Sequence, residues 1–180
     1  MPAQTSYTLY TRDEIVGMLY GISYTNSVRH SYANTKADGT AGADVGFGLA
    51  VEVLQLASDP SQRIAGLGNA ATPGGAGTNT AFIDGISIRS INRTMSTLPG
   101  TGAIAYSGFE TMGVLREGFI HVLVTAGSAV QGVKAFINAA TGAFQGAAVA
   151  NVTLETTNVV WDRTNSVGEI GLVRITSAAV

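Results

Sequence analysis

The side chains that could carry out chemistry in this sequence are few and widely separated. The two histidines are His30, in a polar stretch, and His121, inside the apolar run at 119–124. A histidine in such a run could be a buried base or ligand, but we expect a hydrogen-bonded strand or interface residue, and we place His30 at the surface or an interface. The chain has no cysteine, which excludes a thiolate zinc site and a cysteine nucleophile.

The acidic residues and the glycine motifs indicate no catalytic site either. The 12 acids are isolated except for Asp13 and Glu14, which suit a helix start, whereas hydrolytic pairs need two carboxylates about 5–9.5 Å apart. No Gly-x-Ser-x-Gly elbow occurs. Gly66–Ala71 matches G-x-G-x-x-A, but it opens a glycine-rich loop instead of joining a strand to a helix. We therefore predict no enzyme, no catalytic residue, no cofactor and no metal.

The aromatic residues are better candidates for binding. The interface candidates are the single tryptophan and five of the six tyrosines: Tyr7, Tyr10, Tyr20, Tyr24, Tyr32 and Trp161. The tyrosines could form a sugar-binding patch or a protein contact, and we favour the contact because tyrosine is enriched at interfaces. Trp161 could stack on a ligand, but we favour a core or subunit-interface anchor.

Charge is scarce in this chain. Charged residues make up 12% of it and the net charge is −2, against about 25% charged residues in a typical soluble domain. Such a composition favours a protein that hides much of its surface in contacts, and we expect it to self-associate. Lys36 and Lys134 are the only lysines and the arginines are scattered, so we expect no nucleic-acid partner, because phosphate binding needs a basic cluster.

The length of 180 residues suits one domain, or a domain with an arm. The start of the chain shows no basic region followed by an apolar run, so we expect no signal peptide. No stretch approaches the ~20 apolar residues of a membrane helix, and we expect no membrane partner.

The apolar pattern along most of the chain is that of short strands. Residues 44–53 alternate apolar and small side chains with period two, and 119–125 form an apolar run typical of a strand buried on both faces. Short β patterns separated by glycine, asparagine and serine turns follow to the end of the chain. We predict a mainly β domain over 36–180, a small β-barrel or jelly-roll-like sandwich, with a long Gly-rich loop at 57–80.

The first 35 residues differ from this pattern, and we predict an extended N-terminal arm at 1–35. Thr11 and Glu14 could form a capping box, and apolar residues with helical spacing follow, so a short helix at 11–22 is possible within the arm. We expect both 1–35 and 57–80 to be contact segments outside the core.

The second half of the chain resembles the structural cement, or head decoration, proteins of tailed bacteriophages. The segments that carry the resemblance are the apolar strand at 119–124, the strand with an exposed tip at 132–137, the turn at 141–143, and Trp161 about ten residues before 168–175. The similarity covers roughly 110–176, with a weaker echo at 1–56. It implies a small β-barrel or jelly-roll domain with arms that clamp capsid subunits, and it carries over no catalytic residue.

The resemblance implies a protein that binds the outside of an assembled phage capsid and stabilises it by non-covalent contacts between major capsid proteins. The implied partners are the major capsid protein and further copies of this chain, as a homodimer or homotrimer. The implied location is the capsid exterior of the virion, after assembly in the host cytoplasm. The alternative is a head-fibre or tail adhesin module that binds a surface glycan, which should show an exposed cluster of aromatic and acidic residues.

Overall fold

The protein is built from β-strands and turns. The computed structural model describes residues 16–19, 27–66, 80–89, 105–149 and 152–177, and these ranges contain no helix. Its strands are β1 (Val28–Asn34), β2 (Val45–Gly46), β3 (Ala50–Leu56), β4 (Asp59–Gly66), β5 (Thr80–Ala81), β6 (Gly85–Ser87), β7 (Ala105–Tyr106), β8 (Thr111–Leu123), β9 (Lys134–Asn138), β10 (Phe144–Gln145), β11 (Thr153–Trp161) and β12 (Ile170–Ile175).

The strands of the first half of the chain close a small barrel with part of β8. β1 pairs in parallel with β4 and antiparallel with the first half of β8, from Thr111 to Glu117. β4 then pairs with β3, β3 with β6, and β6 with β8, so that the ring returns to its first strand. The prediction of a mainly β fold, as a small barrel or a jelly-roll-like sandwich, is confirmed.

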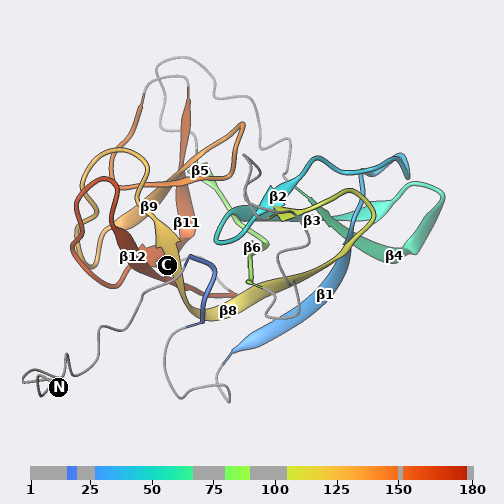
Figure 1. The fold of residues 1–180 in the computed structure, drawn as a ribbon, viewed down its shortest axis with the longest axis horizontal. Coiled ribbons are helices and arrows are strands. Elements are labelled where there is room, and N and C mark those ends of the chain that lie inside the picture. The colour runs from blue at the N-terminus through green and yellow to red at the C-terminus, as the bar shows by residue number, and fades with distance from the viewer. Residues whose placement is uncertain (1–15, 20–26, 67–79, 90–104, 150–151, 178–180) are drawn as a thin grey trace, which may run out of the picture.

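The last third of the chain extends the sheet beyond the barrel. β12 pairs with the second half of β8, and β11, β9 and β10 follow in that order, all antiparallel. β5 adds to β11 in parallel. Figure 1 shows the two groups of strands on opposite sides, with β8 (yellow) passing from one group to the other.

Gly118 marks the point at which β8 passes from the barrel to the outer sheet. Glu117 pairs with Val28 of β1, whereas Gly118 pairs with Ile175 of β12. The φ of Gly118 is 130°, a conformation that side-chain-bearing residues rarely adopt. A Cβ on this residue would also lie 3.2 Å from the Cβ of Ser27. Glycine therefore permits one long strand to serve two sheets.

The described residues form two apolar cores, the larger of which also takes Ala50 and Ile86 from barrel strands. The barrel buries Tyr32, Val45, Val51, Ala65, Tyr106, Met112 and Val114. The larger core lies under the outer sheet and includes Trp161, which meets Phe144 edge-on at 6.4 Å between ring centroids. Such edge-to-face pairs add to the free energy of burial itself. The two cores meet at β8, where Val114 belongs to the first and Leu115 to the second.

The single strand predicted at 44–53 is interrupted in the structure. β2 ends at Gly46, the chain turns at Phe47 and Gly48, and β3 begins at Ala50. Gly48 has a φ of 68°, and buried Ser87 stabilises the turn by accepting from Leu49 N and donating to Gly46 O with its hydroxyl. The alternation of apolar residues survives because Val45 and Val51 still point into the barrel core.

The possible helix at 11–22 is wrong where the structure describes it. Residues 16–19 form a turn and an isolated bridge between Leu19 and Ile120, and Gly17 has a φ of 78°, outside the helical region. Gly17 N donates to His121 O at 2.7 Å, and His121 N donates to Met18 O at 3.0 Å. Pairing with β8 therefore takes the backbone groups that a helix would use internally. The rest of the predicted helix lies outside the described residues.

The predicted arm at 1–35 and loop at 57–80 each contain a barrel strand where the structure describes them, whereas 1–15, 20–26 and 67–79 lie outside the described residues. β1 occupies 28–34 of the predicted arm, and β4 occupies 59–66 of the predicted loop. Most side chains of both strands are exposed, and only a few near their ends are buried. Backbone pairing with β8 and β3 therefore holds these strands in place, without the alternating apolar residues by which a strand is recognised in sequence.

Candidate functional site

The histidines and acidic residues are the side chains in the described part of the chain that could bind a metal ion or transfer a proton. No set of three or more histidine, aspartate or glutamate side chains lies close enough to hold a metal ion there. His121 is 5% exposed within β8, and His30 is exposed on β1 with its ring 6.0 Å from that of Tyr32. The G-x-G-x-x-A match begins at the end of β4, and its remaining residues lie outside the described ranges.

The predicted interface aromatics divide into two groups. Tyr32 is 9% exposed and lies in the barrel core, and Trp161 is 1% exposed and lies in the larger core. Both therefore stabilise this chain's own fold and present almost no surface to a partner. The other candidates, Tyr7, Tyr10, Tyr20 and Tyr24, lie outside the described residues.

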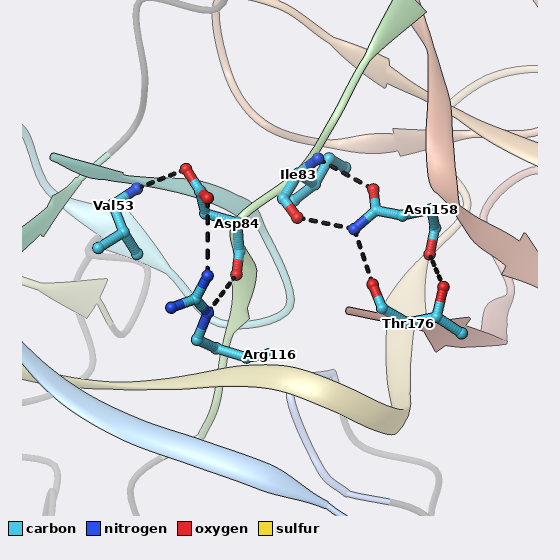
Figure 2. A network of polar contacts seen from close by, with 6 residues as sticks. All are labelled: Val53, Ile83, Asp84, Arg116, Asn158 and Thr176. Atoms are coloured by element: carbon cyan, nitrogen blue, oxygen red, sulfur yellow. Dashed lines mark hydrogen bonds and ion pairs between the residues drawn. The ribbon is translucent and has the colours of Figure 1, made fainter. Parts of the chain in front are cut away.

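Asn158 joins three segments that are distant in sequence (Figure 2). Its Nδ2 donates to Ile83 O at 2.8 Å and to Thr176 O at 3.0 Å, while its Oδ1 accepts from Ile83 N at 2.9 Å. The pairing of β11 with β9 shifts register here, and buried Thr156 donates from its hydroxyl to Ala135 O and Val159 O. A buried asparagine satisfied in this way fixes the position of the chain before β6.

A small pocket of about 180 Å³ lies beside this network. Its lining residues are Val28, His30, Phe82, Ile83, Asp84, Arg116, Glu117, Thr176 and Ser177. Arg116 donates from Nε to Asp84 O at 3.2 Å and lies 3.8 Å from the Asp84 carboxylate, which also accepts from Val53 N (Figure 2). Burial, and secondarily the charge of Asp84, raises the pKa of nearby Glu52. The lining therefore combines apolar side chains, among them Val28 and Ile83, with the charged groups of Asp84, Arg116 and Glu117.

One end of the outer sheet presents a group of apolar side chains on a well-bonded pair of loops. Leu123, Val130, Val133 and Val167 are 40–53% exposed. The loop from 124 to 133 pairs with the loop from 162 to 169 through Ala129 and Asn165, which exchange backbone hydrogen bonds of 2.9 and 3.1 Å. Residues 123–133 include no charged side chain. We call Leu123, Val130, Val133 and Val167 the apolar loop end.

A second exposed apolar residue lies on the barrel. Phe109 is 63% exposed, at the tip of the turn between β7 and β8. Its φ of 67° is in the left-handed region, and it is the one residue other than glycine with a positive φ in the described part of the chain. Neither Phe109 nor the apolar loop end is among the interface candidates that the sequence indicated. The sequence signal that could have pointed to Phe109 is an aromatic side chain among small and polar turn residues at 107–110.

The fold and these exposed surfaces define the class to which the protein belongs. It is an all-β protein whose described residues include exposed apolar side chains on hydrogen-bonded loops. No helix in the described ranges is long and apolar enough to cross a membrane.

Comparison with known families then identifies the family within this class. A family model described as structural cement protein (E217 gp24/Pam3 gp6) matches residues 3–176, nearly the whole chain. The chain belongs to this family and is a structural protein of the bacteriophage capsid. The resemblance seen in the sequence is confirmed, and the match extends over the segment between its two parts. No curated protein matches the chain.

Proposed function

We propose that this protein binds the outside of the assembled phage capsid and stabilises it through non-covalent contacts with the major capsid protein. The observation that carries the proposal is the family match over residues 3–176. The charge-poor composition and the apolar loop end support it, since both suit a protein that works by burying apolar surface. The protein acts by binding alone, without catalysis.

The stabilisation follows from selective binding. A protein that binds the assembled lattice more tightly than free capsid subunits shifts the equilibrium towards the shell. Many copies bind on one symmetric particle, so modest contacts at each position sum to a large effect. Self-association as a dimer or trimer adds to this effect, because one oligomer can bind several capsid subunits.

We further propose that the N-terminal segment contributes to attachment. Tyr7, Tyr10, Tyr20 and Tyr24 are suited to contacts with a partner, because tyrosine combines a large apolar ring with a hydrogen-bonding hydroxyl. The protein joins the particle in the cytoplasm of the host bacterium and remains on the capsid exterior.

The test is to add the purified protein to heads assembled without it. We expect saturable binding to the shell, little binding to free capsid subunits, and a rise in the temperature at which heads rupture. Rupture can be followed by release of packaged DNA to a fluorescent dye. Binding without a rise in rupture temperature would contradict the stabilising role. Equal binding to free subunits would contradict the proposal that selective binding to the assembled lattice stabilises the shell.

A further inference from the structure

The turn that carries Phe109 has its glycine at the position that does not need one. Glu110 N donates to Ser107 O at 3.1 Å, which closes a turn with Gly108 and Phe109 at its centre. Phe109 has a φ of 67°, while Gly108 is not among the residues with positive φ. The second central position of such a turn ordinarily selects glycine or asparagine, because an L side chain is strained there.

Packing explains the glycine but not the phenylalanine. A Cβ on Gly108 would lie 2.6 Å from Ala41 Cβ and 2.9 Å from Gly42 O, so a side chain at 108 would collide with the neighbouring loop. Phe109 points away from the fold and is 63% exposed. Its ring adds little to the chain's own stability, and its backbone conformation costs stability.

The strained turn is held in place by Asn34, a fully buried residue at the end of β1. Asn34 N donates to Glu110 O at 2.8 Å, and Phe109 N donates to Asn34 O at 2.7 Å. The Asn34 side-chain amide donates to carbonyl oxygens on both flanking loops, those of Ala43, Tyr106 and Ser107. The backbone of the turn is therefore held in one conformation, which lowers the entropy cost of binding.

We propose that Phe109 is an anchor residue that inserts into an apolar pocket on the major capsid protein. This inference rests on the proposed function and names one contact within it. Strain retained at an exposed aromatic residue is typical of a binding site, and a preorganised aromatic anchor is typical of an interface hot spot. The Glu110 carboxylate accepts a hydrogen bond from Ser107 N, so the acid next to the ring already has a partner within the turn.

The partner that we propose for the ring is the major capsid protein, which the proposed function names. The pocket described on this chain has Asp84, Arg116 and Glu117 in its lining beside Val28, Phe82 and Ile83, so a phenylalanine ring entering it would also cover charged groups. An apolar receiving site suits the ring better, and the capsid subunit is the other partner that the proposed function supplies.

The experiment measures binding to heads assembled without the protein, by co-sedimentation, for wild type and three variants. Phe109→Asn replaces the ring by a residue that tolerates the left-handed conformation, and Phe109→Ala removes the ring. Phe82→Ala is the control, because it removes another aromatic side chain that is 50% exposed. We expect both Phe109 variants to bind at least about tenfold more weakly and Phe82→Ala to stay within about twofold. The midpoint of thermal unfolding of Phe109→Asn should be equal to or above that of wild type, because its backbone strain is relieved.

Wild-type-like binding by both Phe109 variants would overturn the anchor and leave the proposed function standing. An equal loss on Phe82→Ala would also overturn it, because the effect would then belong to exposed aromatic surface in general. Failure of the wild-type protein itself to bind the heads would overturn the proposed function, and the anchor with it.

Discussion

At the scale of single residues, buried polar groups determine much of the geometry of this fold. Asn34 holds the β7–β8 turn, Ser87 holds the turn between β2 and β3, and Asn158 ties the segment before β6 to β11 and the end of β12. A buried amide without partners would cost about 1–3 kcal/mol. A buried amide whose oxygen and nitrogen are both hydrogen-bonded, as in Asn158, favours one arrangement of strands over others that bury the same apolar area.

Glu52 gives a prediction about pH. Its pKa is raised, first by burial and then by the charge of Asp84, so the folded state binds the proton more tightly than the unfolded state. The charged form therefore costs stability at neutral pH, and this cost disappears as the pH falls through the raised pKa towards the ordinary value of 4.5. We expect Glu52→Gln to raise the melting temperature by about 1–2 °C at pH 7. The gain should vanish near the ordinary pKa, as thermal unfolding across the pH range would show.

Asp59 supplies a control of opposite sign. Hydrogen bonds from the hydroxyl and backbone N–H of Ser61 lower the pKa of the exposed Asp59 carboxylate. Its contribution is present above the unfolded pKa and is lost as the pH falls through the folded pKa. Asp59→Asn should therefore lower the melting temperature slightly at pH 7 and have no effect in acid. If Glu52→Gln lowered the melting temperature at pH 7, as expected for Asp59→Asn, the raised pKa of Glu52 would be contradicted.

At the scale of elements, one strand joins the two halves of the molecule. β8 forms one wall of the barrel and then pairs with β12, and the change of partner falls at Gly118. No other strand of the described chain pairs within both groups, so the relative placement of the two cores depends on how this strand bends.

Gly118→Ala should be strongly destabilising. The substitution introduces a Cβ 3.2 Å from Ser27 Cβ at a φ of 130°, and we expect a loss of about 2–3 kcal/mol in the free energy of unfolding. Gly132→Ala is the matched control, because Gly132 also has a positive φ but open space where its Cβ would lie. It should cost about 1 kcal/mol. Urea denaturation measures both, and equal losses would show that close packing at the junction contributes nothing.

At the scale of the whole molecule, the low charge predicts how attachment responds to salt. Charged residues make up only 12% of the chain, so they cannot furnish a rich network of ion pairs with a partner. At 1 M salt the reach of charge interactions shrinks to about 3 Å, whereas apolar burial persists. We expect intact particles washed in molar sodium chloride to retain most of this protein, as quantified by gel densitometry. Quantitative release from otherwise intact particles would show that ion pairs hold it.

The sequence by itself determined the fold class and the kind of function. The period-two alternation at 44–53 and the apolar run at 119–124 predict strands, because side chains in a sheet alternate between faces or are buried on both. The scattered histidines and acids and the absence of cysteine argued against chemistry, and the patterns at 110–176 indicated the cement family.

Only the tertiary structure decided how the barrel closes and which residues are exposed. β1 and β4 have mostly exposed side chains, so their place in the barrel comes from long-range backbone pairing that no side-chain pattern records. Around Gly17, backbone hydrogen bonds to β8 take the place of the helix that the sequence pattern allowed. Trp161 is buried and Phe109 exposed although both are large aromatic residues, because exposure depends on which distant strands cover a position. Residue type sets what a side chain can do, and long-range contacts decide whether a partner can reach it.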